Sequence, residues 1–453
     1  MKKIILVFIF VASILSGCTS INNVEQYMKP PTMDEDTEEV KNVIYSKLPG
    51  NAEFLYPTYG NIRNSIFFVD VDGNGSREAL VFNYVEGEEA PIYITVLSKK
   101  DSFWAVQYTI KNIGFAIDQV EIVDLNNDNK KELILGWQGG DIVEKGITIY
   151  SLGIDENVEV FQDVYSKFVV GDLNKNNVDE LFLIKRNSSR GTSKAQMYEY
   201  VDSEFELIDS VHMEGYIDDY YSITFGKADS STEGIFIDAR IGDRSGFTDL
   251  IIYENDKLKN VFYDTTSKST AKTFKTKLIE SRDVDGDGII EIATLRTAAR
   301  SGDINQGEKT QWIRVWNKWD SEDGLLNVYE SFQDEKGTYQ FILPKSWDKN
   351  IGIETKVLSD ESSVSSFYYL MPKSKEEIPL MELYSIDSNE WTEKKLDIDY
   401  EKPFIQVDKK YNKVFMAYIY PEIENTDIPT IEIDTDTVKE NFIILNLDRD
   451  GGN

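Results

Sequence analysis

The sequence predicts an all-β chain whose main part is a β-propeller of four-stranded blades, followed by a small C-terminal α+β domain. Two observations predict this fold. An acidic segment flanked by β-type runs recurs along the chain, and each copy is followed by two further short β-type runs. Four short antiparallel strands recurring at about 50-residue spacing are typical of a propeller blade. Five blades fit residues 52–335, and six or seven would require copies that the sequence does not reveal.

The repeats align on an aspartate that follows the first β-type run of each copy. These residues lie 54, 48 and 111 residues apart: Asp70, Asp124, Asp172 and Asp283. The last gap is about twice the others, and a worn fifth copy begins inside it at Ile223. We expect the segment from Phe54 to Tyr59 to pair into the last blade and close the ring.

The repeats and the ends of the chain predict four regions. Residues 1–17 form a lipoprotein signal peptide, 18–51 a lipidated tether with a short helix, 52–335 the propeller and 336–453 the small α+β domain. The helix is expected over residues 37–48, where apolar positions follow acidic ones and Lys47 stands near the end. The last region has its own alternating runs, with a helical segment from Thr435.

The N-terminus predicts export and attachment to a membrane. Lys2 and Lys3 precede a short apolar run that ends in Leu15, Ser16, Gly17 and Cys18. The run is too short for a membrane span. The ending resembles the lipobox of bacterial lipoproteins, which implies a diacylglycerol on Cys18 and a location on the extracellular side of the cell membrane. The alternative is an ordinary cleaved signal with a chance cysteine.

The composition limits the partners. The formal net charge is −32, so nucleic acids and anionic lipid surfaces would be repelled. Cys18 is the only cysteine, which excludes an intrachain disulfide. An exported chain without disulfides is held by its core, by metal, or by both.

The acidic loops predict calcium sites. Counted from the first aspartate, positions 1, 3 and 5 carry Asp or Asn, position 6 is Gly or Asn, and position 9 is always Glu. A left-handed residue at position 6 would turn oxygens at positions 1, 3, 5 and 9 inward, and the backbone carbonyl at position 7 adds another. Six to eight hard oxygens suit Ca²⁺, whereas zinc, copper and iron prefer His or Cys ligands, which are absent here. The predicted ligands are Asp70, Asp72, Asn74, Ser76 and Glu78; Asp124, Asn126, Asp128, Lys130 and Glu132; Asp172, Asn174, Asn176, Val178 and Glu180; and Asp283, Asp285, Asp287, Ile289 and Glu291.

We therefore expect three or four Ca²⁺ ions. The loop at Asp283 has the most carboxylates and is expected to bind calcium most tightly, and the loop at Asp172 has the fewest and is expected to bind it most weakly. The alternative is that the loops are polar hairpin turns without metal.

The repeated unit of strand, D-x-[DN]-x-[DN]-[GN]-x-x-E and strand resembles the FG-GAP or VCBS-type repeats of integrin α-chain propellers and of many bacterial surface proteins. The resemblance covers about residues 52–335. It implies that each loop joins the first two strands of its blade and is made rigid by calcium. The Phe-Gly and Gly-Ala-Pro elements of that family are not evident, so the looser bacterial repeats are the better match.

The sequence favours binding over catalysis. His212, the only histidine, lies in an alternating β-type run, and no nucleophile elbow, metalloprotease helix or phosphate loop is present. We predict a chain that is not an enzyme and that binds or scaffolds a glycan or protein at the cell surface. The alternatives are a glycan-active hydrolase or lyase and a purely structural envelope component. The candidate contacts are the insertion from Ala298 and the tryptophans, which otherwise pack between blades: Trp104, Trp137, Trp312, Trp316 and Trp319.

Overall fold

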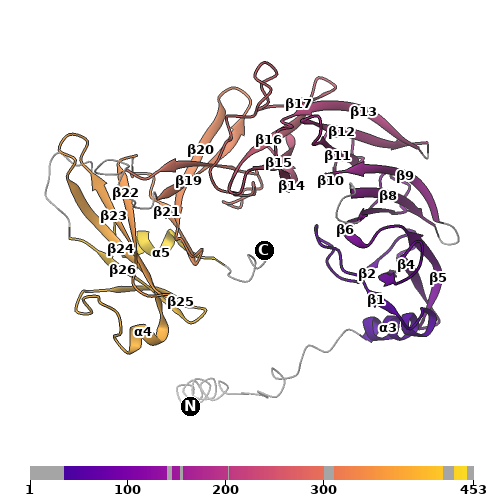
Figure 1. Ribbon diagram of the computed structural model, residues 1–453, viewed down its shortest axis with the longest axis horizontal. Helices are drawn as coiled ribbons and strands as arrows, with labels where there is room; N and C mark the ends of the chain where they lie inside the picture. The colour runs from indigo at the N-terminus through magenta and orange to yellow at the C-terminus, as the bar shows by residue number, and fades with distance from the viewer. Residues whose placement is uncertain are drawn as a thin grey trace, which may run out of the picture. The chain divides into compact units, whose positions relative to one another are not determined.

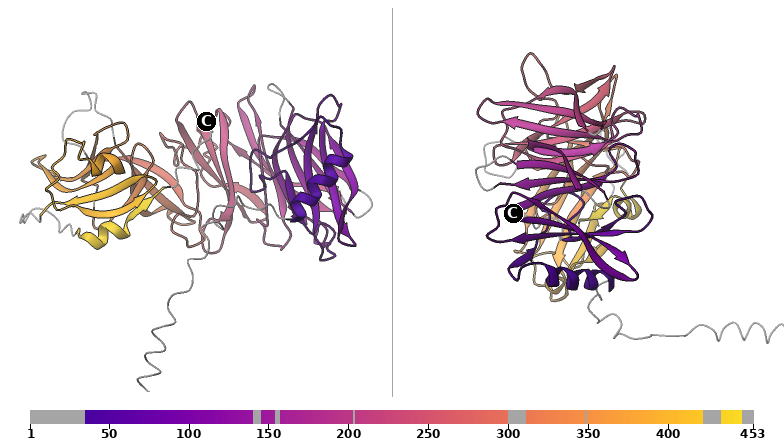
Figure 2. Two further views of the ribbon diagram at one scale, coloured as in Figure 1. Left: turned by 90° about the horizontal axis from the view of Figure 1, so that it is seen from below. Right: turned by 90° about the vertical axis from the view of Figure 1, so that its right-hand side faces the viewer.

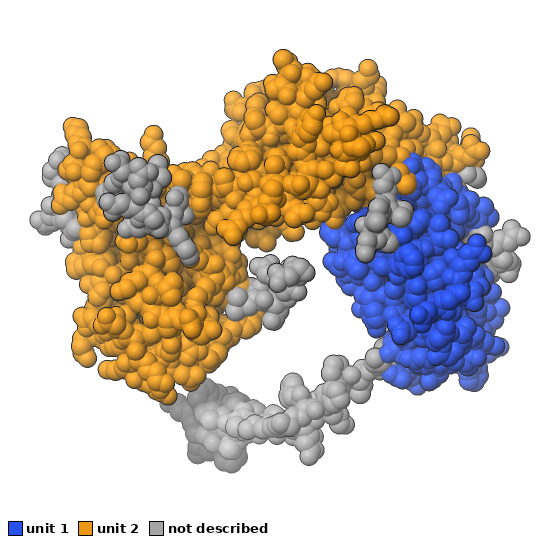
Figure 3. All heavy atoms as spheres, viewed as in Figure 1, with its two compact units in different colours: residues 1–124, 128–163 blue, residues 125–127, 164–453 orange. Residues whose placement is uncertain are grey.

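The computed structural model describes residues 35–445, apart from residues 140–144, 154–156, 203, 300–310, 348 and 422–432. The predicted signal peptide, Cys18 and most of the insertion from Ala298 therefore lie outside the described residues. The chain divides into two compact units, residues 1–124 with 128–163 and residues 125–127 with 164–453 (Figure 3). Within the described ranges, no helix has both the length and the apolar character that crossing a membrane requires.

The first unit contains a helix and two antiparallel sheets (Figure 1). The helix α3 (Glu35–Lys47) has acidic residues in its first turn and Lys47 in its last, as the helix dipole favours. Its buried Val40 and Ile44 lie one turn apart and pack against the first sheet. Figure 2 shows the helix lying along the strands of this sheet. The first sheet consists of β1 (Ala52–Phe54), β2 (Ile66–Val69), β3 (Glu78–Val85), β4 (Ile92–Lys100) and β5 (Phe103–Asn112), and the second of β6 (Ala116–Val123), β7 (Glu132–Gln138), β8 (Lys145–Leu152) and β9 (Asn157–Tyr165).

The second unit begins with two further four-stranded sheets, in each of which consecutive strands are neighbours. The third sheet consists of β10 (Lys167–Gly171), β11 (Glu180–Asn187), β12 (Thr192–Val201) and β13 (Glu204–Met213). The fourth sheet corresponds to the worn repeat and consists of β14 (Asp219–Lys227), β15 (Glu233–Ile241), β16 (Ser245–Glu254) and β17 (Lys257–Asn260). The worn loop thus keeps its hairpin although most of its acidic residues are missing.

The fifth sheet is completed by residues from two distant parts of the sequence. Its strands are β18 (Ile292–Thr297), β19 (Trp312–Asp320), β20 (Gly324–Gln333), β21 (Tyr339–Leu343) and β27 (Phe442–Ile444). β27 pairs with β21, and the short helix α5 (Thr435–Glu440) immediately precedes it. In place of a first strand, Arg282 forms an isolated antiparallel bridge with Glu291. The acidic loop at Asp283 is therefore closed by a single pair of residues.

The sixth sheet belongs to the C-terminal α+β part. It consists of β22 (Ile351–Val357), β23 (Ser363–Leu370), β24 (Glu377–Asp387), β26 (Lys413–Ile419) and β25 (Ile405–Lys410), and the helix α4 (Ser388–Thr392) follows β24. Its apolar face and the fifth sheet share one core, which includes Phe332, Phe341 and Phe367.

Alternation along the strands explains why the first and second sheets stack. Leu80 and Phe82 of β3 and Leu133 and Leu135 of β7 lie two residues apart, so each pair points to one face of its sheet and enters a shared core. The predicted fold class is confirmed: the chain is all-β, with propeller-type blades of four antiparallel strands and a small α+β part at the C-terminus. The prediction that the segment from Phe54 to Tyr59 pairs into the last blade was wrong, because Phe54 pairs with Asn83 in the nearby β3.

Candidate metal loops and a charged pocket

Each of the four acidic loops contains two residues with left-handed backbone conformation. Position 6 is left-handed as predicted, at Gly75 (φ 86°), Asn129 (φ 69°), Asn177 (φ 68°) and Gly288 (φ 85°). Position 4 is left-handed as well, at Gly73, Asn127, Lys175 and Gly286. The sequence analysis missed position 4, although Gly or Asn stands there in three loops. The two left-handed residues give the loops the same tight curvature.

The aspartate at position 1 closes each loop by accepting the backbone N–H of position 6. The N···O distances are 2.8 Å from Gly75 to Asp70, 2.9 Å from Asn129 to Asp124, 2.9 Å from Asn177 to Asp172 and 2.9 Å from Gly288 to Asp283. The side-chain oxygen at position 5 similarly accepts the N–H of position 7, which belongs to Ser76, Lys130, Val178 and Ile289. The loops are therefore held by their own side chains, which orders them before any ion binds.

The glutamate at position 9 is buried in every loop. Glu78 is 5% exposed, and Glu132, Glu180 and Glu291 are 0% exposed. In three of the loops, one carboxylate oxygen of this residue accepts the backbone N–H of position 2, at Val71 (3.1 Å), Leu173 (2.9 Å) and Val284 (2.8 Å). The other oxygen of Glu180 is buried without a hydrogen-bond partner among the described residues, whereas that of Glu291 lies 3.4 Å from the Lys318 ammonium group. A buried carboxylate with an unpaired oxygen is costly unless a cation compensates it.

Burial is also the main influence on the pKa values of Glu78, Glu180 and Glu291. Desolvation raises the pKa of Glu180 to about 7, although the backbone N–H of Leu173 opposes the shift. Desolvation likewise raises the pKa of Glu78 and of Glu291. A divalent ion at this position would reverse the shift, because it favours the charged carboxylate.

The structure brings three carboxylates close together in each of two loops. Carboxylate oxygens of Asp70, Asp72 and Glu78 lie within 4.8 Å of one another, as do those of Asp283, Asp285 and Asp287. In the worn repeat, Asp229 accepts hydrogen bonds from the backbone N–H groups of Ser231 and Thr232 (2.7 Å each) and so stabilises the turn in which it lies. The donors in the four loops are carboxylate and amide oxygens, which fit calcium.

A residue on the third strand of each blade lies beside the position-9 glutamate, and the sequence analysis did not identify it. Strand pairing places Ser151 opposite Glu132. In the other blades, Ser98, Glu199 and Lys318 each stand one residue beyond the last paired residue of the third strand, in line with Glu78, Glu180 and Glu291. Ser151 donates a hydrogen bond of 3.1 Å to Glu132. Glu199 accepts one of 3.0 Å from Asn174. This neighbour therefore differs in charge from one loop to the next.

The neighbour of the loop at Asp283 is a cation. Lys318 Nζ lies 3.1 Å from Asp285 Oδ2 and 3.4 Å from Glu291 Oε1, and it also contacts Asp287. Desolvation lowers the pKa of Lys318, but the carboxylates of Asp287 and Asp285 outweigh it and raise the pKa overall. The most acidic loop therefore carries an internal counter-charge, whereas the least acidic loop gains a carboxylate from Glu199.

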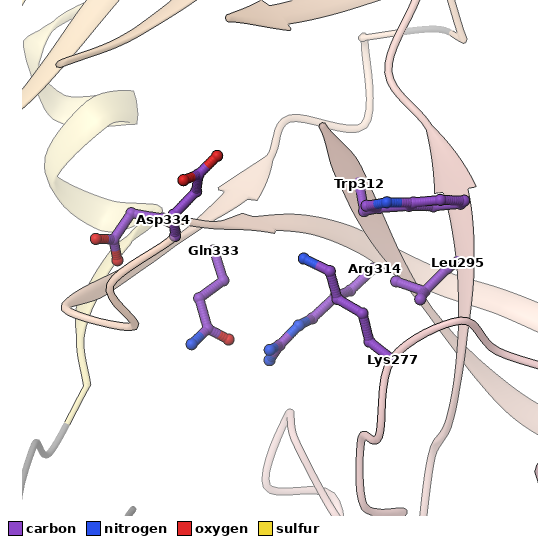
Figure 4. A pocket seen from close by; sticks show the side chains of 7 residues that line it. Lys277, Leu295, Trp312, Arg314, Gln333 and Asp334 are labelled. Carbon is purple, nitrogen blue, oxygen red and sulfur yellow. The ribbon is translucent and has the colours of Figure 1, made fainter. Parts of the chain in front are cut away.

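A charged pocket lies on one face of the fifth sheet, apart from the loops (Figure 4). Its volume is about 150 Å³, and it is lined by Lys277, Leu295, Trp312, Arg314, Gln333, Asp334 and Glu335. Among the predicted contact tryptophans, Trp104, Trp137, Trp316 and Trp319 are buried in cores. Trp312 is only partly buried and lines this pocket. The structure thus leaves Trp312 as the tryptophan of that group available for a ligand.

Comparisons with known proteins leave the family open. No family model matches the chain, and no curated protein matches it. Solved structures resemble it at low identity. A rhamnogalacturonan lyase from Bacillus licheniformis is 11% identical, with 72% of this chain and 76% of that chain covered and a TM-score of 0.31. The β-propeller domain of the Trilobed protease from Pyrococcus furiosus is 11% identical, with 75% and 100% covered and a TM-score of 0.28. An exo-β-1,3-galactanase from Phanerochaete chrysosporium is 7% identical, with 74% and 79% covered and a TM-score of 0.28.

One prediction from the sequence is corrected by this comparison. The chain was predicted not to be an enzyme, but lyases and a galactanase are among the solved structures that resemble it. The exclusion of catalysis is therefore withdrawn. At these TM-scores the likeness assigns no activity to this chain.

Proposed function

We propose that this chain is an exported lipoprotein, anchored through Cys18, whose calcium-stabilised blades bind a glycan at the cell surface. The observation that supports it best is the set of buried position-9 glutamates, because their carboxylate oxygens are desolvated and one oxygen of Glu180 has no hydrogen-bond partner among the described residues. A hard cation would satisfy these oxygens and would fix the loop that joins the first strands of each blade.

The fit to calcium depends on the oxygen atoms that would coordinate the ion. Each loop offers carboxylate oxygens, joined in three of the loops by the amide oxygens of Asn, on a backbone that is already curved by two left-handed residues. Ca²⁺ takes six to eight such oxygens at about 2.3–2.6 Å and tolerates irregular geometry, whereas Mg²⁺ demands a strict octahedron. The proposal is for three or four ions, with ligands as predicted from the sequence.

The glycan is supported by the pocket that Trp312 lines. A tryptophan face that is partly accessible next to charged and amide side chains is suited to a sugar, because the ring packs on the indole and the hydroxyls find hydrogen-bonding groups. The net charge of −32 makes nucleic acid an unfavourable partner.

A glycan array probed with the purified chain, with calcium and with chelator, tests this proposal. We expect binding to a restricted set of glycans that weakens when calcium is removed. Elemental analysis of the dialysed protein provides the matching metal count. A chain that retains no calcium and binds no glycan in either condition would overturn the proposal.

The anchor is tested separately in cells. Cys18→Ala removes the thiol that the lipid requires, so the chain should appear in the medium instead of the membrane fraction. The substitution Ser16→Ala, two residues before Cys18, keeps a small residue and serves as the control. Equal membrane retention of Cys18→Ala and the parent would rule out this anchor.

Cleavage of the bound glycan is the second candidate, and one observation favours it. Partial desolvation and the nearby Arg314 lower the pKa of Lys277, which increases the fraction of neutral amine able to accept a proton. Glycans bound on the array should be incubated with the chain, and the products separated by chromatography. New shorter products that disappear in Lys277→Gln would favour an enzyme, and an unchanged glycan would favour a binding protein.

A further inference from the structure

The hairpin that joins β11 to β12 in the third sheet carries positive charge only (Figure 1). Residues 181–198 contain no Asp or Glu, although 80 of the 453 residues of the chain are acidic. Lys185 and Lys194 are direct cross-strand partners, and like charges in that arrangement cost stability. The stability of the sheet therefore does not explain the charge of this basic hairpin (residues 185–194), whose cations are Lys185, Arg186, Arg190 and Lys194.

Two cations of the basic hairpin are available to a ligand. Arg190 and Lys194 are exposed, and neither side chain makes a hydrogen bond or an ion pair with another of the described residues. Arg186 has a different role, because its guanidinium donates hydrogen bonds to the backbone carbonyls of Ile217 and Asp218, the latter at 3.0 Å. It thereby holds the connection that crosses from the third sheet to the fourth.

The acidic residues of this connection have partners of their own. Glu214 accepts a backbone N–H two residues further along the chain (3.0 Å). Asp218 accepts the backbone N–H of Gly242 (2.5 Å), and Asp219 is the cross-strand partner of Arg240 in the fourth sheet. Within the described part of the chain, none of the three carboxylates forms an ion pair with the arginine at the tip of the basic hairpin.

Tyr216 of the same connection presents its ring to solvent at the tip of the basic hairpin. The residue is 76% exposed. A Cβ atom on Gly191 would lie 2.6 Å from Cε1 of the ring, and a Cβ atom on Gly215 would lie 2.2 Å from the backbone oxygen of Gly191. Only glycine fits at both positions, so the connection packs directly on the hairpin tip and fixes the place of the ring. A ring that is fixed and exposed can contact a ligand at a low cost in ordering.

The surroundings of this ring suit a sugar better than a protein. Residues 185–194 contain no apolar side chain, whereas the hot spots of protein interfaces place an aromatic residue within a well-packed, desolvated patch. The hairpin tip offers the hydroxyl groups of the exposed Ser188 and Thr192. Hydroxyl and guanidinium groups can form hydrogen bonds with the hydroxyls of a sugar whose ring packs on the tyrosine.

We infer that the basic hairpin and Tyr216 bind one uronic-acid residue of an acidic glycan, with its carboxylate on Arg190 and its ring on Tyr216. The inference rests on the proposed glycan-binding function, adds a second contact to the pocket of Trp312 and names the class of glycan. The planar guanidinium can bind a carboxylate through two parallel hydrogen bonds, and Lys194 adds positive charge. The net charge of −32 is screened beyond about 8 Å at physiological ionic strength, so these local cations determine the attraction.

Calorimetric titration of the full chain in calcium tests this inference with three probes: a galacturonate trisaccharide, a neutral galactose trisaccharide and a glutamate hexapeptide. We expect the galacturonate trisaccharide to bind and the other two to bind at least about tenfold more weakly. Arg190→Gln should lower the affinity for the galacturonate trisaccharide by at least about tenfold, because it removes a charge-assisted contact.

The ring is tested by a pair of variants. Tyr216→Ser should lower the affinity for the galacturonate trisaccharide by at least about tenfold, and Tyr216→Phe, which keeps the ring, should bind it like the parent. Arg244→Gln is the matched control for Arg190→Gln, because Arg244 is an exposed arginine at the tip of the hairpin between β15 and β16 and has Asp243 beside it. It should bind the trisaccharide like the parent.

The outcomes separate this inference from the proposed function. Parent-like affinity in Arg190→Gln and Tyr216→Ser would overturn it, as would an equal loss in Arg244→Gln. A hexapeptide that binds as tightly as the galacturonate trisaccharide would point to a protein partner and would overturn the choice of a glycan. Equal binding of the neutral trisaccharide, or a loss confined to Trp312→Ala, would also overturn the inference, while the glycan-binding function would stand. A parent chain that binds no glycan on the array would remove the proposed function, and the inference with it.

Discussion

Lys318 is the residue with the largest expected effect on a single calcium loop. Its ammonium group contacts three of the carboxylates predicted to hold an ion, so calcium at the loop of Asp283 must displace it. Lys318→Met removes this charge and keeps the aliphatic stem that packs on the sheet. We expect the calcium affinity of this loop to rise at least about tenfold, as measured by calorimetric titration.

The control for Lys318→Met is the same substitution at a lysine that has no acidic loop beside it. Lys257 is exposed at the start of β17, and Lys257→Met should leave all calcium affinities as in the parent. An identical titration for Lys318→Met and the parent would show that the lysine does not compete with the ion.

Asp249 predicts a pH dependence of stability that is independent of calcium. The residue is fully buried on β16 and accepts hydrogen bonds from Asn260 (2.9 Å) and Thr270 (2.6 Å). Desolvation raises the pKa of Asp249 to about 6 in the folded chain, above its ordinary value of 3.8. The folded state therefore binds more protons than the unfolded state between about pH 4 and pH 6, and the contribution of Asp249 to stability falls as the pH rises through this window.

The variant Asp249→Asn tests whether the contribution of this residue to stability falls as the pH rises. The variant keeps the accepting oxygen and removes the charge, so at pH 7 it should be more stable than the parent by roughly 1–3 kcal/mol. Chemical denaturation at several pH values measures the difference, which should vanish near pH 4. Asp243→Asn, at an exposed aspartate, is the control. A parent and an Asp249→Asn variant with parallel pH profiles would contradict the assignment.

At the scale of the element, a strand neighbour and not the loop alone determines the charge of each site. Glu199 of β12 lies beside Glu180 and accepts a hydrogen bond from Asn174 of the loop. It adds a carboxylate to the loop that has the fewest. Lys318 reduces the charge of the loop that has the most. Calcium is predicted to bind most tightly at the loop of Asp283 and most weakly at the loop of Asp172. The difference between these two affinities should therefore be smaller than the loop sequences indicate.

Glu199→Ser tests the role of this neighbour, because Ser occupies the equivalent position at Ser98 and Ser151. The substitution should lower the calcium affinity of the loop at Asp172 by about tenfold and leave the calcium affinities of the other loops unchanged. Titration calorimetry measures the affinities, and Asp243→Ser, at an exposed aspartate of the same unit, is the control. Equal weakening in both variants would point to a general loss of acidic charge instead.

The sequence predicts the strands and loops well, because the alternation along a strand and the residue types at the loop positions are both local patterns. The alternating run Ile92–Leu97 lies within β4, and Gly or Asn at position 6 correctly indicates a left-handed turn at Gly75. Lys175 was missed at position 4 because lysine has no preference for that conformation, and the hydrogen bonds of its loop impose it.

The parts that were missed depend on pairing between distant residues. Lys318 lies 27 residues after Glu291, and only the register of β18 with β19 places them side by side. The pocket requires Lys277 and Arg314 to meet across 37 residues. A single sequence does not contain the register, so neither could be predicted from it.

At the scale of the whole molecule, calcium is expected to supply a large part of the stability. A loop with a dissociation constant near 10⁻⁴ M gains about 1.4 kcal/mol in millimolar calcium, so three or four loops gain roughly 4–6 kcal/mol together. This is comparable to the total free energy of unfolding of many domains. The loop at Asp70 lies in the first unit and the loops at Asp172 and Asp283 lie in the second, so both units should respond.

Thermal unfolding in calcium and in chelator measures this contribution. Melting should shift upward with calcium and should continue to shift as its concentration rises above the dissociation constants, because the ion binds the folded loops and not the unfolded chain. Magnesium at the same concentration and ionic strength is the control, since it fits these irregular oxygen sites poorly. If each unit unfolds separately, two transitions should appear, and Glu78→Gln should lower the calcium response of the first unit alone. Identical curves in calcium, magnesium and chelator would mean that the loops are stable hairpins without metal, since the hydrogen bonds that Asp70 and its counterparts accept from backbone N–H groups already close them.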